Sequence, residues 1–435
     1  MPRLALLLVL SALGCGESAR LTVDQTSGAA PTLAEPNRTL IPTLNFADAE
    51  GWADGRAPTP APGLEVARFA DGLDHPRWLH VLPNGDVLVA EAKAPPQDGP
   101  GGLTGLVTRY FKRKAGVAGE SADRITLLRD ADGDGRAELR EPFLTDLASP
   151  FGMALVGDWL YVANSGSIVR VPYTEGQIRA DAAPEHVADL PLGAINQHWT
   201  RSLLASPDGA TLFVGVGSAS NVGEHGMAEE EGRAAIWAVD VDTGAARLFA
   251  TGLRNPVGLA WGPGGRLWTA VNERDMLGSD LVPDYLTSVE DGAFYGWPFV
   301  YFGDTADDRA PEPAAPPPPA LVPDYALGAH TASLGLAWTD GSDLGIGPGM
   351  LVGQHGSWNR RPKSGYKVVL VPFVDGAPTG LPVDVLTGFL SRDEETAFGR
   401  PVGVELDGRG GVLVADDVGD TVWRITPAAA PAAGR

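Results

Sequence analysis

The stretch that decides the fold is Arg400–Asp417, RPVGVELDGRGGVLVADD, in which two short apolar runs flank a turn built from Asp and Gly. Two β-patterned runs joined by such a turn indicate a β-hairpin. The same pattern begins at His75 (HPRWLHVLPNGDVLVAEA) and at Asn255 (NPVGLAWGPGGRLWTAVNE). Further copies begin at Ser149, Thr200 and Ala332, which gives six copies at uneven intervals.

This repeat predicts the architecture. A single hairpin unit cannot bury both of its faces, so repeated units must pack against one another. Gly (56) and Pro (37) together make up 93 of 435 residues, a density of turn-forming residues that favours many short strands and argues against a helix bundle. We therefore expect an all-β protein, a six-bladed β-propeller of four-stranded antiparallel blades over residues 63–428.

The charge balance narrows the possible partners. The chain has 33 Lys and Arg against 55 Asp and Glu, a formal net charge of −22. Nucleic-acid binders present a basic surface to the phosphates, so we expect no nucleic-acid partner. A 44% hydrophobic content is enough to build a core.

The first residues have the pattern of an export signal. Arg3 precedes an apolar run, Leu4–Leu13, that is too short to span a bilayer, and Gly14 precedes Cys15, the only cysteine. The segment ALGC resembles a bacterial lipoprotein cleavage box, although an ordinary signal peptide with an incidental cysteine would also fit. We expect a signal peptide over residues 1–15, a flexible Pro- and Ala-rich tether over 16–62, and a disordered tail over 429–435. The protein is then exported to the periplasm or outer-membrane surface and touches the membrane only through a lipid on Cys15.

Basic residues recur where the copies begin. Inner strands of a propeller line its axis, so residues at the repeat starts should converge there. Arg77, Arg201, Arg254 and Arg400 occupy these positions, and Arg360, Arg361 and Lys363 follow the fifth copy. Any one of these cations could simply pair with a carboxylate. Their recurrence in an acidic chain indicates an anionic small ligand on the axis, because arginine binds carboxylates and phosphates in bidentate fashion.

Histidines occur at the same places. His75, His198 and His330 lie at repeat starts, and His355 follows the second run of the fifth copy. A single histidine is usually structural, but several beside arginines suggest a general base together with ligand donors.

Two acidic segments suggest a metal. Asp130, Asp132, Asp134, Glu138 and Glu141 fit the spacing of a calcium-binding loop, although an Asp/Gly-rich hairpin turn would look the same. The second segment, VNERDMLGSDLVPDY, begins at Val271 and follows the fourth copy.

Five segments carry a resemblance to a known family: LRNPVGLAW from Leu253, VNERDMLGSDLVPDYLTSVEDGAFYGWP from Val271, GAHTASLGLAW from Gly328, GQHGSWNRRPKSGYKV from Gly353 and GRPVGVELDGRGGVLVADD from Gly399. Together they resemble the sorbosone dehydrogenase family, within the soluble quinoprotein sugar dehydrogenases that use pyrroloquinoline quinone (PQQ) and Ca²⁺. The resemblance extends from about His75 to Thr426.

The resemblance implies roles for individual residues. His198 matches the catalytic base, and Arg254 with Asn255 matches the pair that contacts the quinone oxygens. Glu273 and Arg274 match the residues whose carbonyls hold Ca²⁺, although the glucose-oxidising branch has a Gly-Pro pair there. The remaining expected cofactor-binding residues are Arg201, His330, His355, Arg360, Arg361, Lys363 and Arg400.

We therefore expect an exported PQQ- and calcium-dependent dehydrogenase that oxidises an aldose or sorbosone-like sugar and passes electrons to a quinone or small redox protein. Two alternatives stay open at this point. One is a calcium-dependent, lactonase-like hydrolase, which needs acidic side chains along the axis. The other is a non-catalytic binding propeller, because fold alone does not determine function.

Overall fold

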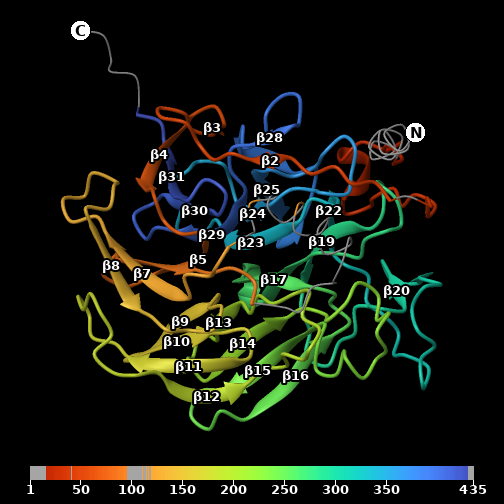
Figure 1. Ribbon diagram of the computed structural model, residues 1–435, viewed down its shortest axis with the longest axis horizontal. Helices are drawn as coiled ribbons and strands as arrows, with labels where there is room; N and C mark the ends of the chain where they lie inside the picture. Colours follow the sequence, from red (N-terminus) through yellow and green to blue (C-terminus); the bar gives the residue numbers. More distant parts are fainter. Residues whose placement is uncertain are drawn as a thin grey trace, which may run out of the picture.

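Six β-sheets surround a central axis (Figure 1), in a computed structural model that describes residues 16–40, 42–95, 110, 114, 116 and 119–429. Each sheet contains four antiparallel strands in consecutive order, and two sheets gain extra strands at their outer edges. The predicted six-bladed β-propeller is confirmed. The expected signal peptide and most of the expected C-terminal tail lie outside the described residues.

The blades are numbered from the N-terminal side of the ring. Blade 1 contains β5 (Pro76–Val81), β6 (Val87–Glu91), β7 (Arg124–Arg129) and β8 (Leu139–Leu144). Blade 2 contains β9 (Met153–Val156), β10 (Trp159–Ala163), β11 (Ser167–Pro172) and β12 (Glu185–Asp189). Blade 3 contains β13 (Leu203–Ala205), β14 (Thr211–Val216), β15 (Ala235–Asp240) and β16 (Ala246–Thr251).

Blade 4 contains β17 (Pro256–Trp261), β18 (Leu267–Val271), β19 (Pro283–Ser288) and β22 (Tyr325–Ala329). Blade 5 contains β23 (Ser333–Trp338), β24 (Gly349–Gln354), β25 (Lys367–Val374) and β27 (Val383–Thr387). Blade 6 contains β29 (Pro401–Leu406), β30 (Val412–Asp416), β31 (Thr421–Pro427) and β4 (Leu64–Ala70). Short strands outside this frame are β20 (Val300–Tyr301), β21 (Thr305–Ala306), β26 (Ala377–Pro378) and β28 (Thr396–Ala397), and two 3₁₀ turns are η2 (Asp24–Thr26) and η3 (Pro263–Gly265).

Blade 6 combines strands from both ends of the described chain. Its outer strand β4 comes from the N-terminal side and pairs antiparallel with β31, with Leu64 opposite Pro427 and Ala70 opposite Val422. In Figure 1 the orange β4 therefore lies beside the dark blue β31. This pairing closes the ring, because strands from both ends of the described chain complete one sheet. The propeller therefore has no gap between its first and last blades.

The core lies between neighbouring sheets. In β30, Val412 and Val414 pack toward blade 5, whereas Leu413 and Ala415 pack toward blade 1. Successive side chains of a strand point to opposite faces, so a strand buried on both faces must be apolar throughout. This explains the unbroken run GVLVA in the sequence. All six junctions between neighbouring blades hold a buried hydrophobic cluster of this kind.

Close packing at the axis depends on glycine. A Cβ atom at Gly335 of β23 would overlap the backbone of Val402 in β29, and one at Gly403 would lie 2.9 Å from the carbonyl oxygen of Arg77 in β5. Glycine at equivalent places in these inner strands lets their backbones approach closely.

Residues 16–62 do not behave as the flexible tether that composition predicts. Three short strands, β1 (Ser27–Gly28), β2 (Asp48–Ala49) and β3 (Thr59–Pro60), pair with β22, β28 and β27. The Trp52 indole donates a 2.6 Å hydrogen bond to the buried carboxylate of Asp416. The segment runs across blades 4 to 6 in Figure 1 and is part of the folded body. Among the described residues, no helix is long and apolar enough to cross a membrane.

Candidate active site

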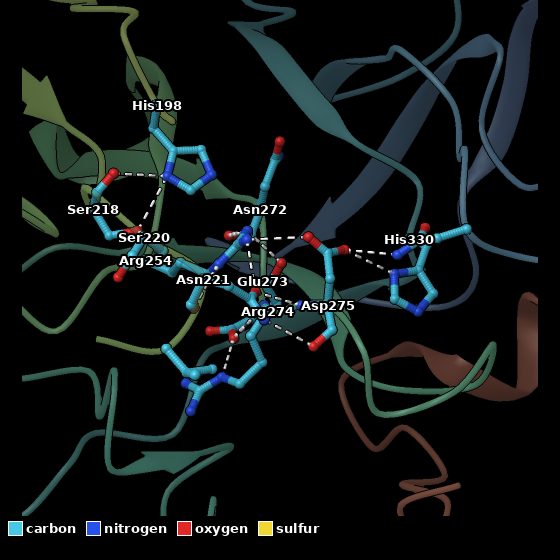
Figure 2. A network of polar contacts seen from close by, with 12 residues as sticks. His198, Ser218, Ser220, Asn221, Arg254, Asn272, Glu273, Arg274, Asp275 and His330 are labelled. Atoms are coloured by element: carbon cyan, nitrogen blue, oxygen red, sulfur yellow. Dashed lines mark hydrogen bonds and ion pairs between the residues drawn. The ribbon is translucent and has the colours of Figure 1, made fainter. Parts of the chain in front are cut away.

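The candidate site lies at one end of the axis. In an antiparallel pair, the start of the inner strand and the end of the next strand lie at the same edge of the blade. Arg254 precedes β17 and Asp275 follows β18, so both reach this end. His198 reaches it from the segment before β13, and His330 from the segment before β23 (Figure 2). Together they line a cavity of about 130 Å³.

His198 has a defined tautomer. Its Nδ1 lies 2.8 Å from the carbonyl oxygen of Ser218, which can only accept, so Nδ1 carries the proton. The Ser218 hydroxyl is 3.1 Å from the same nitrogen, and it donates its own proton to the Ser220 carbonyl at 2.6 Å. The lone pair of His198 is therefore on Nε2, for which the described residues supply no hydrogen-bond partner. Burial, and then the charge of Arg254, lower the pKa of His198 to about 3, so the ring is neutral at pH 7.

Arg254 is held by a dense set of acceptors. Its Nη1 donates to the Glu273 carbonyl at 2.6 Å, its Nε donates to the Asn221 carbonyl, and its Nη2 donates to the Asn221 side chain at 2.9 Å. Nη2 also pairs with the Asp275 carboxylate at 3.1 Å. The guanidinium is only 4% exposed, so its charge acts in a medium where water screens it little.

Asp275 joins blade 4 to blade 5. Besides Arg254, its carboxylate accepts from the Asn359 amide at 2.8 Å and lies 3.5 Å from Nδ1 of His330. Burial alone would raise the pKa of Asp275, but Arg254 and His330 hold it below its usual value. Burial would lower the pKa of His330, but the contact with Asp275 raises it. His330 Nε2 also faces the Gly278 carbonyl at 2.8 Å, so both ring nitrogens are committed to protein acceptors and this histidine is a positioning residue with no nitrogen left for a ligand.

Asn255 has an unsatisfied oxygen. Its Oδ1 is buried and has no hydrogen-bond partner among the described residues. The backbone of Gly217 passes beside it, and a Cβ atom at position 217 would overlap both Asn255 Oδ1 and the Cβ of His198. The absence of a side chain at 217 thus lets His198 and Asn255 lie next to each other. A buried acceptor without a donor is costly, which marks a place where a ligand could donate.

A second polar cluster surrounds Asp417, which follows β30. Nε2 of His355 lies 2.9 Å from the carboxylate, His75 lies 3.5 Å away, and Arg77 donates to the same oxygen. Burial would raise the pKa of Asp417, but the contacts with His355, His75 and Arg77 hold it well below its usual value. Arg400 donates to the carbonyls of His355 at 2.8 Å and Gly356 at 2.7 Å. His355 is therefore bonded to protein, whereas Nη1 of Arg400 has no acceptor among the described residues.

Other predicted cofactor ligands have structural roles instead. Arg201 is fully buried and donates to the carbonyls of Pro191, His198 and Thr200, so it shapes the segment that carries His198. Arg360 donates to the Leu21 and Pro362 carbonyls. Lys363 donates to Asn45 and to the Glu394 carbonyl at 2.8 Å. The carbonyl of Arg361 accepts from Ala19. The structure thus places the side chains of Arg360 and Lys363 against the N-terminal segment and neighbouring backbone.

One of the expected calcium carbonyls already accepts from a protein donor. The Glu273 carbonyl already accepts from Arg254, whose positive charge would repel a cation at that oxygen. Arg274 is fully buried and turns away from the cavity, where it donates to the Pro298 and Val300 carbonyls at 2.8 and 2.9 Å. Its Nε pairs with the Glu273 carboxylate. In this arrangement the Glu273 carbonyl serves Arg254 and is not free for a calcium ion.

The acidic loop between β7 and β8 does bring carboxylates together. Ligand atoms of Asp130, Asp132, Asp134 and Glu138 all lie within 4.8 Å of one another. Backbone amides of the loop donate to these carboxylates, for example Gly135 to Asp130 at 3.1 Å. Glu141, the fifth expected ligand, is not in this group and pairs with Arg179 at 2.5 Å.

Sequence reasoning missed Asp275, Asp417, Asn359 and Ser218. Asp275 lies inside the acidic segment from Val271. The composition of this segment suggests metal ligands and does not reveal that Asp275 pairs with Arg254. The available signal was position: each missed residue follows the second strand of a blade, at the edge where the inner strands begin.

Comparisons with known proteins agree with this architecture. An uncharacterized protein of Borreliella burgdorferi is 27% identical over 294 residues, which are 64% of this chain and 76% of that protein. A pyrroloquinoline quinone-dependent pyranose dehydrogenase of Coprinopsis cinerea is 26% identical over 219 residues, 40% of this chain and 30% of that longer protein.

Solved structures extend the likeness to nearly the whole chain. The holo form of a pyranose dehydrogenase PQQ domain from Coprinopsis cinerea superimposes with a TM-score of 0.65 at 20% identity, over 88% of this chain and all of that one. The iodide structure of a Trichoderma reesei protein of Carbohydrate-Active Enzymes Family AA12 gives a TM-score of 0.68 at 20% identity, over 90% of this chain and all of that chain. These superpositions show the same propeller fold, and the resemblance predicted from the sequence is confirmed by the family model.

The TrAA12-like family model matches residues 118–284 and 317–428, more than half of the chain, and the protein belongs to the TrAA12-like family.

Proposed function

We propose that this protein is a quinoprotein dehydrogenase that oxidises a pyranose or related aldehyde sugar, with PQQ as the electron acceptor in the axial cavity. The observation that carries the proposal is the state of His198: a neutral ring whose Nδ1–H is fixed on Ser218 and whose Nε2 lone pair is unoccupied. A neutral imidazole with an unoccupied lone pair can accept a hydroxyl proton. Family membership and the Coprinopsis cinerea relatives support the same chemistry.

The polar groups at the axis fit PQQ, which has three carboxylates and a quinone. Asn255 Oδ1 and Nε of Arg77 are buried and without partners among the described residues, and Arg400 keeps one unpaired nitrogen. Arginine donors suit carboxylates, and unpaired buried groups gain most from a ligand. Arg77, Arg254, Asn255 and Arg400 are the residues that would hold the cofactor.

The roles of the chain's own residues follow from this geometry. PQQ, when bound, supplies a two-electron acceptor for the substrate hydride. Nε2 of His198 takes the hydroxyl proton as the substrate carbon loses the hydride, so the alcohol becomes a carbonyl or lactone. Arg254, fixed by Asp275, places a positive charge where negative charge accumulates during the transfer. The reduced enzyme then needs an external electron acceptor, a quinone or a small redox protein.

Calcium enters the proposal at one of the two places expected from the sequence. We assign it to the loop carrying Asp130, Asp132, Asp134 and Glu138, because four carboxylates in one turn are hard oxygen ligands of the kind this ion prefers. No step at the axis is assigned to a metal. Export and a lipid on Cys15 remain part of the proposal on the sequence pattern alone, and loss of membrane association in a Cys15→Ser variant would test them.

The structure disfavours the hydrolase alternative, because the carboxylates near the axis already accept hydrogen bonds from other groups of the protein. Asp284 accepts from the backbone of Glu273 and Ser333 and from Thr331, and Glu273 pairs with Arg274. Among the described residues, the only group of three or more potential ligands placed for a metal is the one at Asp130.

The deciding experiment is reconstitution. Purified protein is titrated with PQQ, binding is followed by absorbance, and the loaded protein is supplied with aldoses and an electron-accepting dye. We expect saturable PQQ binding and sugar-dependent dye reduction. Absence of both, in protein that melts cooperatively, would overturn the proposal.

A further inference from the structure

The N-terminal segment closes a second cavity against the candidate active site. This cavity, of about 140 Å³, lies between residues 17–40 and 42–43 of the N-terminal segment and the loop after β18. Its lining includes Glu17, Asn37, Thr39 and Thr43 from the segment, Met276 from the loop, and Asn359. Asn359 also lines the cavity of His198 and donates to Asp275, so the two cavities meet at this side chain.

The wall formed by the segment is held firmly in place. The Asp280 carboxylate accepts from the backbone amides of Arg20 and Leu21, at 2.7 and 3.2 Å. The Leu21 carbonyl accepts from Arg360 at 2.9 Å, and the Asn37 amide donates to the Leu277 carbonyl. A wall fixed by backbone bonds of this kind is preorganised for a ligand, which lowers the entropy cost of binding.

The segment also braces the first cavity. Trp358 lines the cavity of His198, and its ring stacks on Phe46 with centroids 5.5 Å apart and planes 23° apart. The backbone of Asn45 donates to the Trp358 carbonyl at 2.7 Å, and Lys363 donates to the Asn45 side chain at 2.9 Å. These contacts explain why Arg360 and Lys363 are placed against the N-terminal segment: they dock it beside the site.

The chemistry of the second cavity suits a neutral polyol. The Asn37 amide and the Thr43 hydroxyl donate to Glu17, and the Asn359 amide donates to Asp275. The amide oxygens of Asn37 and Asn359 and the hydroxyl oxygen of Thr43 keep lone pairs to which sugar hydroxyls can donate. Met276, 42% exposed, adds an apolar surface for the C–H face of a ring. No lining residue carries a positive charge, so an anionic group would gain nothing there. The volume suits one sugar ring and not a long chain.

We propose that this second cavity is an outer subsite that binds the sugar unit attached to the ring being oxidised, so that the enzyme favours a disaccharide over the matching monosaccharide. This inference rests on the proposed function. The ring being oxidised lies at His198, and the attached unit extends past Asn359 between Met276 and the N-terminal segment. The lining residues of the N-terminal segment thereby become determinants of specificity, a role outside the propeller repeats.

The test compares two tryptophan substitutions one residue apart. Thr39→Trp places a large ring in the subsite, whereas Leu40, whose side chain is fully exposed, is absent from its lining. PQQ-loaded wild type and both variants are assayed with glucose against cellobiose and maltose, and galactose against lactose. We expect wild type to show the higher kcat/KM for the disaccharides. Thr39→Trp should lower the disaccharide-to-monosaccharide ratio at least tenfold, and Leu40→Trp should leave it unchanged.

A second variant and a binding measurement distinguish an effect on the subsite from a folding defect of Thr39→Trp. Asn37→Ala removes an amide without adding bulk and should lower the same ratio in protein with a wild-type melting profile. Methyl β-lactoside, followed by saturation-transfer NMR, should bind wild type and Leu40→Trp more tightly than Thr39→Trp. An equal ratio in all variants, with monosaccharides oxidised normally, overturns the subsite but leaves the proposed function standing. Failure of every sugar in PQQ-loaded protein overturns both.

Discussion

His198 donates its Nδ1–H to the carbonyl oxygen of Ser218 across 2.8 Å, and this single bond decides which ring nitrogen can accept a proton. A carbonyl has no hydrogen to give, so the lone pair must lie on Nε2. Ser218 follows β14, the strand that is paired with the inner strand of the same blade. The blade therefore supplies both the base and the group that orients it.

Replacing His198 by Gln should separate catalysis from binding. General-base catalysis contributes about 10²–10⁴ in rate, so we expect turnover per bound PQQ to fall by that factor while PQQ binding persists. Cofactor occupancy and turnover are measured on the same sample. His186→Gln is the matched control, because this histidine lies on β12 and pairs with Asp189 at 2.8 Å, away from the axis. Near-wild-type turnover per PQQ would eliminate His198 as the base.

Arg400 should contribute directly to cofactor affinity. Hydrogen bonds to charged groups contribute about 1.5–3 kcal/mol, so Arg400→Ala should weaken PQQ binding at least about tenfold in a titration. Arg247→Ala serves as the control, because that arginine is exposed and pairs with Asp291. If both variants bind PQQ equally well, the cofactor does not lie against Arg400.

The carboxylate loop of blade 1 should couple calcium to stability. A ligand that binds only the folded state raises the melting temperature with its concentration. The double variant Asp132→Ala, Asp134→Ala should abolish the Ca²⁺-dependence of melting. Glu141→Gln should retain it, because Glu141 pairs with Arg179 and lies outside the group. If Glu141→Gln abolished the Ca²⁺-dependence of melting and the double variant did not, the calcium ligands would not be the four carboxylates proposed.

His80 on β5 should make the fold sensitive to acid. Burial lowers the pKa of its imidazole from 6.5 to about 4. The unfolded chain then binds a proton that the folded chain does not, so this contribution to stability is complete above pH 6.5 and is lost as the pH falls toward 4. Relative to His80→Gln, wild type should lose stability between these limits. Unfolding free energies of both proteins, measured by urea titration from pH 4 to 7.5, give this difference, and a pH-independent gap would contradict it.

The position of Gly217 should be intolerant of any side chain. A Cβ atom there overlaps His198 and Asn255, so Gly217→Ala should displace the base and lower turnover while the propeller still melts cooperatively. Gly166→Ala is a milder comparison, because its added carbon would meet only the Leu192 side chain, at 3.2 Å. Full activity in Gly217→Ala would show that the base tolerates movement.

The repeats could be predicted because each copy carries its own evidence. Runs such as Val412–Ala415 are apolar at every position, since their side chains face two neighbouring blades, and the turn residues between runs mark the hairpins. The same repeats predicted that His198 and Arg254 approach the axis. Such information is local, and six copies reinforce it.

What could not be predicted depends on long-range contacts. Arg201 and Arg254 occupy similar places in their copies, yet Arg201 turns to backbone carbonyls and Arg254 to the cavity. Spacing gives the position of a side chain along a strand but not the acceptors it meets. Residues 16–62 were predicted as a tether from composition, because their partners, such as Asp280 and Trp358, are hundreds of residues away.

The pairing of β4 with β31 also has a consequence for biosynthesis. The strand made early, at Leu64–Ala70, has no partner until residues 421–427 have been synthesised more than 350 positions later. A contact of such high sequence separation forms slowly, because the intervening loop must first be ordered. The ring therefore stays open for nearly the whole of translation. A nascent chain whose last blade is incomplete exposes apolar faces, to which chaperones can bind. The propeller can close only when the seven residues of β31 have been synthesised.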